Sequence, residues 1–522
     1  MSRSFKVVDI FAGPGGLAEG FSSYRAGGKH VFELALSVEK EVSAFRTLRL
    51  RAFTRHFDQE LPQEYYDYVA GQIGLDQLTC CYPSQWAAAC AETKQLELGA
   101  PEAASELDPI LKKLARETSG NSVLVGGPPC QAYSLVGRAR NRGNVDYDPS
   151  QDHRHFLYKE YIRIIGMLQP AIFVMENVKG FLSSRIGGER IFNRVLSDLR
   201  SAGGAPDSYR IVPLTADGGR NGAEFLIRAE KYGVPQARHR VILLGIRSDL
   251  DVGDRGNHPW LDQRPVTSVR DVLGGMPRLR SGLSKSIDGP QQWRQVAIEA
   301  MRTAGEASFA FEDELMDRVA QRLCDGMQEL NCVRDLPPRS SVAAAPLENK
   351  ELSDWLFDPR LSSLPNHETR GHMAEDLTRY AFAIAYSDVA GRSPKAGAYP
   401  VALAPRHDNW SSGKFADRFR VQTWDSPSTT VTSHISKDGH YFIHPDLLQC
   451  RSLTVREGAR LQTFPDNYFF EGNRTQQYVQ VGNAVPPYLA HQIAAVVHGY
   501  LEPQVVRPLR AGTSRQMSLT LT

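Results

Sequence analysis

Four side chains stand where a sheet would direct them into a common crevice. Cys130 follows the strand-like run 122–125 and two prolines, Glu176 ends a second such run, and Arg238 and Arg240 stand two residues apart before a third. In parallel α/β sheets, binding groups gather at the carboxyl ends of the strands. A stiffly mounted thiol can act as a nucleophile, a carboxylate can hold a proton, and arginines can stabilise negative charge.

Each of these residues also has a purely structural interpretation. A lone cysteine is most often a small core residue. Glu176 could cap the helix that follows it, and two arginines on one face of a strand could line an exposed edge. Taken singly, the residues leave both interpretations open, and only their joint arrangement favours chemistry.

A glycine-rich turn near the N-terminus predicts a nucleoside pocket. A β-rich run over 6–11 ends in Phe-Ala-Gly-Pro-Gly-Gly and leads into a helix-like segment over 17–24. Glycines let the backbone approach a ligand closely, and a helix N-terminus presents free N–H groups. The next strand, 31–38, ends in Glu39, where a carboxylate can bond both hydroxyls of a ribose. Because the glycines do not match G-x-G-x-x-G, an adenosine-type cofactor without phosphates is favoured over a dinucleotide.

The alternation of strand and helix patterns predicts the fold of the first part of the chain. Further strands are expected at 122–125, 171–175, 209–214 and 240–246, and helices at 155–168 and 189–200. This spacing indicates an α/β domain over residues 1–250, with a mostly parallel sheet and helices on both faces.

The rhythm breaks down in the middle of the chain. Scattered prolines and loop-rich stretches over 251–440 indicate an irregular, smaller second domain. A helical pattern resumes at 454–464, with Thr454 and Glu457 as a capping box, and again after two prolines, so 441–505 is expected to return to the first domain. Residues 506–522 are expected to form a flexible tail. The stretch 56–96 fits no assignment.

Composition limits the class of protein. At 522 residues the chain exceeds the roughly 250–300 residues of a single core. Its 41% hydrophobic and 23% charged residues indicate a folded protein. Apolar runs fall short of the ~18–20 residues of a membrane span, and Asp9 stands where a secretory leader would be apolar. Seven cysteines without C-x-x-C spacing favour a reducing compartment and no metal, and a net charge of +2 requires any polyanion site to be local.

Considered together and in order, these segments resemble the DNA cytosine-5 methyltransferases. The agreement covers about 1–247 and 450–500, whereas about 250–440 matches the target-recognition region of that family in position only. The matching motifs are the cofactor turn Asp9-Ile10-Phe11-Ala12-Gly13-Pro14-Gly15-Gly16, the ribose acid Glu39, the nucleophile loop Pro128-Pro129-Cys130-Gln131, the base-holding Glu176-Asn177-Val178, the pair Gln236-x-Arg238-x-Arg240, the domain-bracing Arg456-Glu457-x-x-Arg460-Leu461-Gln462-x-Phe464-Pro465 and the C-terminal cofactor segment Gly482-Asn483-Ala484-Val485-Pro486-Pro487. Glu97 is only a candidate for the acid that contacts adenine.

The resemblance implies a Rossmann-like S-adenosylmethionine-dependent methyltransferase. Carbon 5 of cytosine is a poor nucleophile, so the thiolate of Cys130 would first add to carbon 6. Glu176 would hold or protonate N3, Arg238 or Arg240 would favour the thiolate, and an arginine would donate to O2. The residues expected at the cofactor are Phe11, Gly13, Gly15, Gly16, Glu39, Pro129, Asn483 and Ala484.

A cytosine stacked in a duplex is out of reach, so the resemblance also implies base flipping. The arginine-rich segment 134–143 would close on the DNA, although a solvated loop is an alternative. The expected DNA-binding residues are Gln131, Ser134, Arg138, Arg140, Gln236, Arg406, Asn409, Arg418 and Arg420. Asn366–Arg370 with His372 is a second candidate for base reading, and the alternatives for His367, His372 and Asp376 are a helix face or a metal site.

We therefore expect an enzyme that methylates carbon 5 of cytosine in a specific double-stranded DNA sequence. A bacterial restriction–modification or defence system, with a cognate nuclease as partner, is the expected setting, in the cytoplasm with the nucleoid. Transfer RNA is the alternative substrate, but a small RNA-directed enzyme would not need the long middle region. A non-catalytic DNA-binding homologue is disfavoured because every expected catalytic residue is present.

Overall fold

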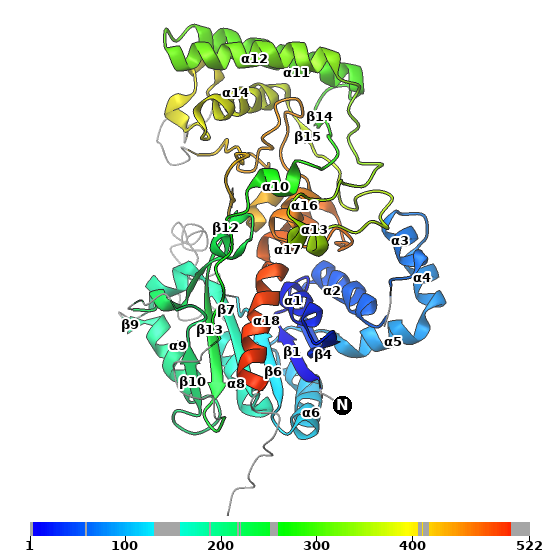
Figure 1. Ribbon diagram of the computed structural model, residues 1–522, viewed down its shortest axis with the longest axis vertical. Coiled ribbons are helices and arrows are strands. Elements are labelled where there is room, and N and C mark those ends of the chain that lie inside the picture. Colours follow the sequence, from blue (N-terminus) through cyan, green and yellow to red (C-terminus); the bar gives the residue numbers. More distant parts are fainter. Residues whose placement is uncertain are drawn as a thin grey trace, which may run out of the picture.

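The computed structural model describes residues 4–57, 60–129, 157–186, 189–216, 219, 221–250, 259–405, 410 and 417–502. A larger body consists of a sheet with helices on both faces, and a smaller helical body lies at one end of the long axis of the molecule (Figure 1). A long C-terminal helix runs alongside the sheet, so the two ends of the described chain meet in the larger body.

An eight-stranded sheet forms the larger body. Its strands are β1 (Phe5–Ile10), β4 (Phe32–Glu39), β5 (Thr93–Gln95), β6 (Ser122–Gly126), β7 (Ile172–Val178), β10 (Tyr209–Val212), β11 (Leu226–Arg228) and β13 (His239–Arg247). They follow the order β10-β13-β7-β6-β1-β4-β5, and β11 pairs with β13. The five strands from β7 to β5 are parallel, whereas β13 is antiparallel to its three neighbours. The predicted mostly parallel α/β sheet is confirmed.

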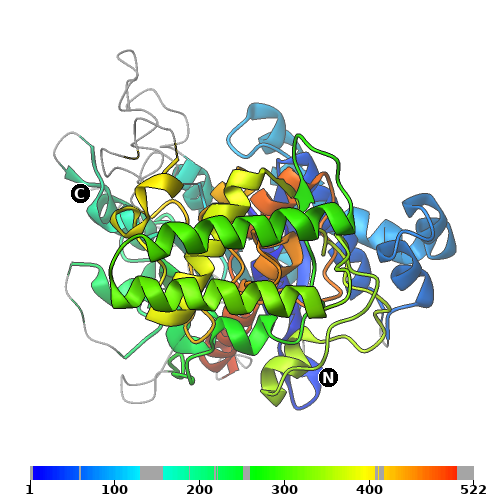
Figure 2. The same ribbon diagram turned by 90° about the horizontal axis from the view of Figure 1, so that it is seen from above.

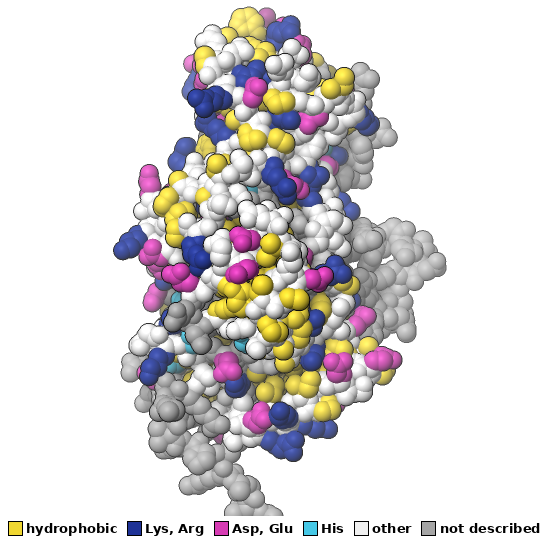
Figure 3. Space-filling model, turned by 90° about the vertical axis from the view of Figure 1, so that its right-hand side faces the viewer, with side chains coloured by type: hydrophobic (Ala, Val, Ile, Leu, Met, Phe, Trp, Pro, Cys, Tyr) yellow, Lys and Arg dark blue, Asp and Glu magenta, His cyan; other side chains and the backbone are white. Residues whose placement is uncertain are grey.

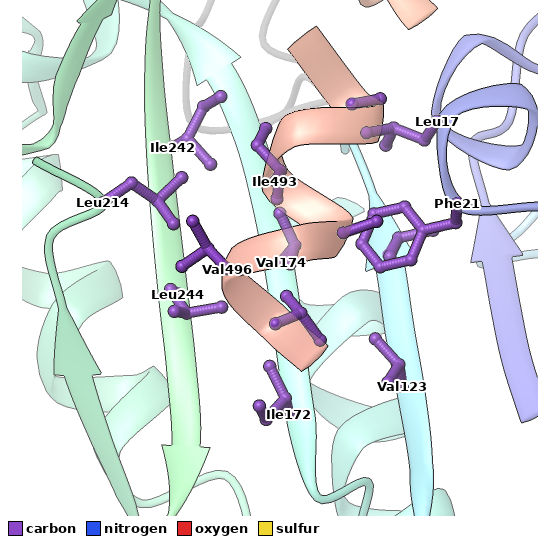
Figure 4. Packing of buried hydrophobic residues seen from close by; sticks show 14 of the residues in the cluster. Leu17, Phe21, Val123, Ile172, Val174, Leu214, Ile242, Leu244, Ile493 and Val496 are labelled. Carbon is purple, nitrogen blue, oxygen red and sulfur yellow. The ribbon is translucent and has the colours of Figure 1, made fainter. Parts of the chain in front are cut away.

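Both faces of the sheet are covered by helices, which explains why its strands are apolar on both sides. The main helices of this body are α1 (Gly16–Ser23), α2 (Val42–Arg55), α6 (Pro101–Thr118), α8 (Leu157–Leu168), α9 (Ile191–Arg200) and α18 (Pro487–Leu501). On one face Phe21 of α1 and Ile493 of α18 pack against Val123 and Val174 (Figure 4). The other face is buried under α6, α8 and α9. Because α18 contributes to this core, the last part of the chain completes the first domain.

The stretch that the sequence left unassigned forms a small helical subdomain. It contains α3 (Gln63–Val69), α4 (Leu75–Cys81) and α5 (Pro83–Glu92), which pack on α2 around a core of their own. These helices are only seven to ten residues long, so no apolar stripe is long enough to reveal them in the sequence. Figure 3 faces this side of the molecule and shows basic and acidic side chains mixed over the surface.

The smaller body is more regular than expected. It is built on three long helices, α11 (Pro290–Phe309), α12 (Glu314–Cys332) and α14 (Ala374–Ala390), and α11 and α12 lie side by side in Figure 2. The inward stripe of α11 consists largely of Ala297, Ala300 and Ala304. Alanines give little hydrophobic contrast with their polar neighbours, so the sequence pattern did not predict this helix. Shorter elements of the region are β14 (Gly282–Leu283), β15 (Gly371–His372), α10 (Val269–Leu273) and α13 (Lys350–Leu356).

Helix α16 (Val455–Leu461) lies where the two bodies join. It begins at Thr454, whose hydroxyl accepts the N–H of Glu457 while the Glu457 carboxylate accepts the N–H of Thr454, so the predicted capping box is confirmed. Glu457 also receives both Nη groups of the fully buried Arg451. Arg460 donates to the Asp466 carboxylate through Nε and Nη2. The next helix is α17 (Arg474–Asn483). These buried pairs fix the segments that support the active site, because breaking one would leave an uncompensated charge.

Two buried histidines beside this helix make the junction sensitive to acid. Burial lowers the pKa of His367 and of His444 to about 4, from an ordinary value of 6.5. As the pH falls, these histidines take up a proton in the unfolded chain before they do so in the folded protein. The free energy of unfolding is therefore highest above about pH 6.5 and decreases as the pH drops toward 4. Each histidine should remove about 2 kcal/mol between pH 7 and pH 5. Denaturant unfolding at the two pH values measures this loss.

A substitution separates these histidines from other acid effects. His367→Gln should shrink the difference in unfolding free energy between pH 7 and pH 5, whatever its cost at pH 7. The exposed His30 provides the matched control, and His30→Gln should leave that difference unchanged. Equal pH differences in the wild type and in His367→Gln would rule out this source of acid sensitivity.

Candidate active site

The cofactor turn joins β1 to α1 in a left-handed backbone conformation. Phe11, Gly13 and Gly15 have φ values of 55°, 57° and 99°. Such values are uncommon for a bulky residue, so Phe11 is held there by its surroundings. The N–H of Gly13 donates to the Glu39 carboxylate over 2.8 Å, and the N–H of Glu41 donates to its other oxygen at the same distance. The turn and the end of β4 therefore form one unit.

The residues of this unit fit a nucleoside. An added Cβ at Gly13 would meet no described atom within 4 Å, so the described structure leaves space beside the Glu39 carboxylate. Burial raises the pKa of Glu39, while the N–H groups of Glu41, Gly13 and Lys40 oppose that rise. Each carboxylate oxygen accepts one N–H and keeps a lone pair for a hydroxyl. This arrangement suits the two hydroxyls of a ribose and would repel a phosphate.

Two glycines of the turn serve packing. An added Cβ at Gly15 would lie 2.9 Å from Leu48 Cδ1, and one at Gly16 would lie 2.2 Å from the Val485 carbonyl oxygen. The C-terminal segment thus approaches the turn as closely as a glycine allows. Asn483 is exposed at the end of α17, and Ala484 next to it is buried. The turn and this segment, which lie far apart in the sequence, are brought together as the resemblance implies.

Glu176 lies within β7 and pairs with Arg240 of β13. Its Oε1 is 2.7 Å from Arg240 Nε, and each side chain keeps 15% of its surface exposed. The alternative that Glu176 caps a helix is wrong, because the residue that caps the following 3-10 helix is Val178. An added Cβ at Gly127 would lie 2.9 Å from Glu176 Oε2. The backbone that leads to Cys130 therefore lies directly against the carboxylate, and only glycine leaves room for both.

Arg238 does not share this position. Strand β12 (Gln236–Ala237) ends before it and β13 begins after it, so the two arginines are not neighbours on one strand face as their spacing suggested. The Arg238 guanidinium is buried and donates to the carbonyls of Val431 over 2.8 Å and of Gly482 over 3.3 Å. Its expected contact with the base is therefore not supported by the structure, and the alternative of an exposed edge is wrong.

Gln236 was expected at the DNA, but its side chain is fully buried. Its Nε2 donates to the Leu461 carbonyl over 3.1 Å, and its Oε1 accepts the N–H of Val431 over 2.8 Å. Both polar atoms are thus used within the protein. The tight strand end that binds the returning segment 428–432 explains this correction, since β12 pairs there with β16 (Ser428–Thr429).

Several expected site residues lie outside the described residues. These are Cys130, Gln131, Ser134, Arg138, Arg140, Arg406 and Asn409. Pro129 is the last described residue before the nucleophile and is half-buried. In the smaller body Arg418 donates to Asp438 over 3.1 Å, and Arg420 pairs with Asp417. Both arginines remain partly exposed, and their reading of DNA stays a prediction.

The second candidate for base reading is not supported. The Asn366 side chain bonds the backbone N–H and carbonyl of Phe470, and His372 is buried against Ser452. Within the part of the chain that the structure describes, no group of three or more His, Cys, Asp or Glu side chains could hold a metal. These residues build the junction between the two bodies.

Two residues that shape the site were not predicted from the sequence. Gly127 makes room for Glu176, and a second glycine after a buried strand could have indicated such a close approach. The Tyr468 hydroxyl donates to the Pro14 carbonyl in the cofactor turn. No local signal links these two, because 454 positions separate them.

Comparison with known proteins agrees with this geometry. The family model for the C-5 cytosine-specific DNA methylase matches residues 70–498. The chain is 33% identical to the type II methyltransferase M.Bpa9945I of Bacillus paralicheniformis, over 94% of this chain and 98% of that protein. It is 26% identical to the type II methyltransferase M.AgeI of Thalassovita gelatinovora, over 94% and 99% of the two chains.

No helix among the described residues is long and apolar enough to cross a membrane.

The residues matched by the family model include strands β6, β7 and β13 and the middle region 251–440. A carboxylate beside a glycine turn suits the hydroxyls of a ribose, and the carboxylate–arginine pair beside Gly127 suits a ring on which negative charge develops. The chain therefore belongs to the C-5 cytosine-specific DNA methylases, the S-adenosylmethionine-dependent enzymes that methylate carbon 5 of cytosine.

Proposed function

We propose that this enzyme methylates cytosine at a specific sequence of double-stranded DNA through covalent addition of Cys130. The observation that carries the proposal is the Glu176–Arg240 pair, which lies against Gly127 at the ends of the central strands. Cys130 stands only three residues beyond Gly127. A base placed against this pair would therefore be within reach of the thiol.

The pair would hold the target ring by its polar edge. Glu176 would hold a proton at N3, and Arg240 would donate to O2, so that negative charge developing on the ring is stabilised. Both side chains are mostly buried, which strengthens these interactions by excluding water. Arg240 also neutralises Glu176 when no base is bound.

The proposed reaction replaces the proton on carbon 5 by a methyl group through a transient bond between Cys130 and carbon 6. The Cys130 thiolate forms a bond to carbon 6, and the electron pair of the 5,6 double bond becomes available at carbon 5. Carbon 5 then forms the new carbon–carbon bond to the methyl group as the bond from that methyl to the sulfonium sulfur breaks, so that a neutral thioether leaves. Transfer of the proton from carbon 5 to water restores the double bond, breaks the bond between carbon 6 and sulfur and releases the thiolate. When bound, S-adenosylmethionine supplies a methyl group that its sulfonium makes electrophilic.

Access to the ring would require base flipping, because carbon 6 is shielded in a stacked duplex. Residues 251–440 would select the sequence, with base-edge contacts from side chains such as Arg418 and Arg420. The related type II methyltransferases support a role in restriction–modification, where methylation would protect host DNA from a cognate nuclease. Such a role would place the enzyme in the cytoplasm.

Methyl transfer from labelled S-adenosylmethionine tests the proposal. Wild-type enzyme should label double-stranded DNA, and bisulfite sequencing should place the methyl group on cytosine within one short motif. Transfer RNA should stay unlabelled. Labelling of transfer RNA alone, or methylation without sequence preference, would contradict the proposal.

Glu39→Ala should weaken binding of S-adenosylmethionine. The substitution removes the carboxylate that would bond the ribose hydroxyls, and it also releases the N–H of Gly13 in the turn. Loss of a charged hydrogen bond costs roughly 1.5–3 kcal/mol, or about ten- to over a hundredfold in affinity. Calorimetry measures this change directly.

Glu41→Ala is the matched control. Its carboxylate accepts the N–H of Ala44 and caps α2, so the change should cost stability and not cofactor affinity. Equal affinities in Glu39→Ala and Glu41→Ala would show that the ribose is bound elsewhere.

A further inference from the structure

The buried guanidinium of Arg238 has no evident task in the proposed reaction. Its hydrogen bonds go to two backbone carbonyls, and its Nε has no partner among the described residues. Burial and the neighbouring Arg240 lower the pKa of Arg238 well below its ordinary value. Burying a charge without a hydrogen-bonded carboxylate is costly. The cost of burying this guanidinium is therefore offset mainly by its bonds to the Val431 and Gly482 carbonyls.

One of its partners is the segment that returns from the target-recognition region. Residues 428–432 lie in the last part of that region, and β16 pairs there with β12 of the larger body in parallel. Val431 is held from both sides, because Gln236 accepts its N–H and Arg238 donates to its carbonyl. The Thr430 hydroxyl adds a bond of 2.6 Å to the Ala237 carbonyl. Any shift of this segment would therefore also displace the Arg238 guanidinium.

Its other partner is the cofactor segment. Gly482 directly precedes Asn483 and Ala484 at the end of α17, and its carbonyl accepts a hydrogen bond from Arg238 Nη2. An added Cβ at Gly482 would lie 2.2 Å from Ser433 N and from Thr432 C, so the two segments touch backbone to backbone. Gln462 fixes the far side by donating to the Val481 carbonyl over 2.7 Å. The cofactor segment can therefore move little without the returning segment.

We propose that Arg238 is a positioning residue that couples the target-recognition region to the cofactor segment. Two nitrogens of one rigid, planar group hold Val431 and Gly482 at a fixed separation. Both bonds lie on one group, 2.8 Å to Val431 and 3.3 Å to Gly482, so a shift of the returning segment on DNA binding would be passed to Gly482. Binding of the cognate sequence then tightens the cofactor site, and by linkage the cofactor tightens DNA binding to the same extent. This inference rests on the proposed DNA-reading function of residues 251–440.

The test is the effect of cognate DNA on cofactor affinity. Calorimetry with S-adenosylhomocysteine, in the absence and presence of a duplex that carries the motif mapped for the wild type, gives a ratio of two dissociation constants. Wild-type enzyme should give a ratio of at least about five, the lower end of ordinary couplings. Arg238→Lys keeps the charge but cannot span both carbonyls, so its ratio should fall close to one, while affinity without DNA changes less than about threefold.

Arg247→Lys is the matched control. Arg247 lies at the other end of β13, is also buried and also donates to two backbone carbonyls, those of Gly120 and Gln169. It should lower stability and keep the wild-type ratio. If Arg238→Lys does not fold, Gln236→Met releases Val431 from the opposite side and should lower the ratio in the same way.

Two results would overturn the coupling. The first is a wild-type ratio of one in an enzyme that methylates its motif, and the second is an unchanged ratio in a folded Arg238→Lys or Gln236→Met variant. Failure of the proposed function has a different signature, because the wild type would then methylate no DNA motif at all.

Discussion

Cys130→Ser should lower methyl transfer to DNA by more than about 10⁴-fold, as removal of a covalent nucleophile does in other enzymes. A serine hydroxyl is nearly the same size as a thiol but stays protonated at neutral pH, so it cannot add to carbon 6. The fold, the affinity for S-adenosylhomocysteine and the affinity for DNA should change little. Single-turnover methylation with labelled S-adenosylmethionine measures the loss.

Cys80→Ser serves as the control, because Cys80 is an exposed thiol on α4, outside the sheet. It should keep full activity. Comparable rates for Cys130→Ser and Cys80→Ser would show that the reaction uses no thiolate at position 130.

Glu176→Gln should reduce the rate of the chemical step by about 10²–10⁴-fold, the range for a lost acid–base group. The amide keeps the size of the side chain but cannot hold a proton at N3, and it leaves Arg240 without its carboxylate. Cofactor affinity should change less than threefold, since Glu39 and the turn are untouched. Single-turnover rates at saturating DNA separate this loss from weaker binding.

Glu230→Gln is the matched control. Glu230 pairs with His239, the residue before Arg240, and its carboxylate lies 2.8 Å from His239 Nε2. This control should cost some stability and leave the single-turnover rate near that of the wild type. A Glu176→Gln enzyme as fast as Glu230→Gln would remove Glu176 from the chemistry.

Strong local patterns were enough to predict the catalytic sheet. The apolar strands that end at Glu39 and Gly126 were placed almost to the residue, because turn glycines and polar strand ends mark where they stop, whereas the strand that carries Glu176 continues two residues beyond it. The capping box at Thr454 was equally local. Such signals depend on neighbours in the sequence, so one chain carries them in full.

The corrected predictions for Gln236 and Arg238 involve partners distant in sequence. Gln236 and Arg238 look like DNA-facing or base-facing residues until residues 428–433 and Gly482 fold onto them, some 190 and 244 positions away. Burial of a polar side chain by such a segment leaves no trace in its own neighbourhood. Helix α11 of the smaller body was missed for a different reason, since its alanine stripe contrasts weakly with its polar face.

Covalent trapping tests the central claim of a Cys130 nucleophile most directly. A duplex that carries 5-fluorocytosine at the methylated position is incubated with enzyme and S-adenosylmethionine and then analysed under denaturing conditions. Fluorine cannot leave carbon 5 as a proton does, so the wild-type enzyme should remain joined to the DNA through Cys130, and peptide mapping should find the link at that residue. The Cys130→Ser enzyme should form no such adduct. An adduct that persists in Cys130→Ser, or a methylating wild-type enzyme that forms none, would contradict the account.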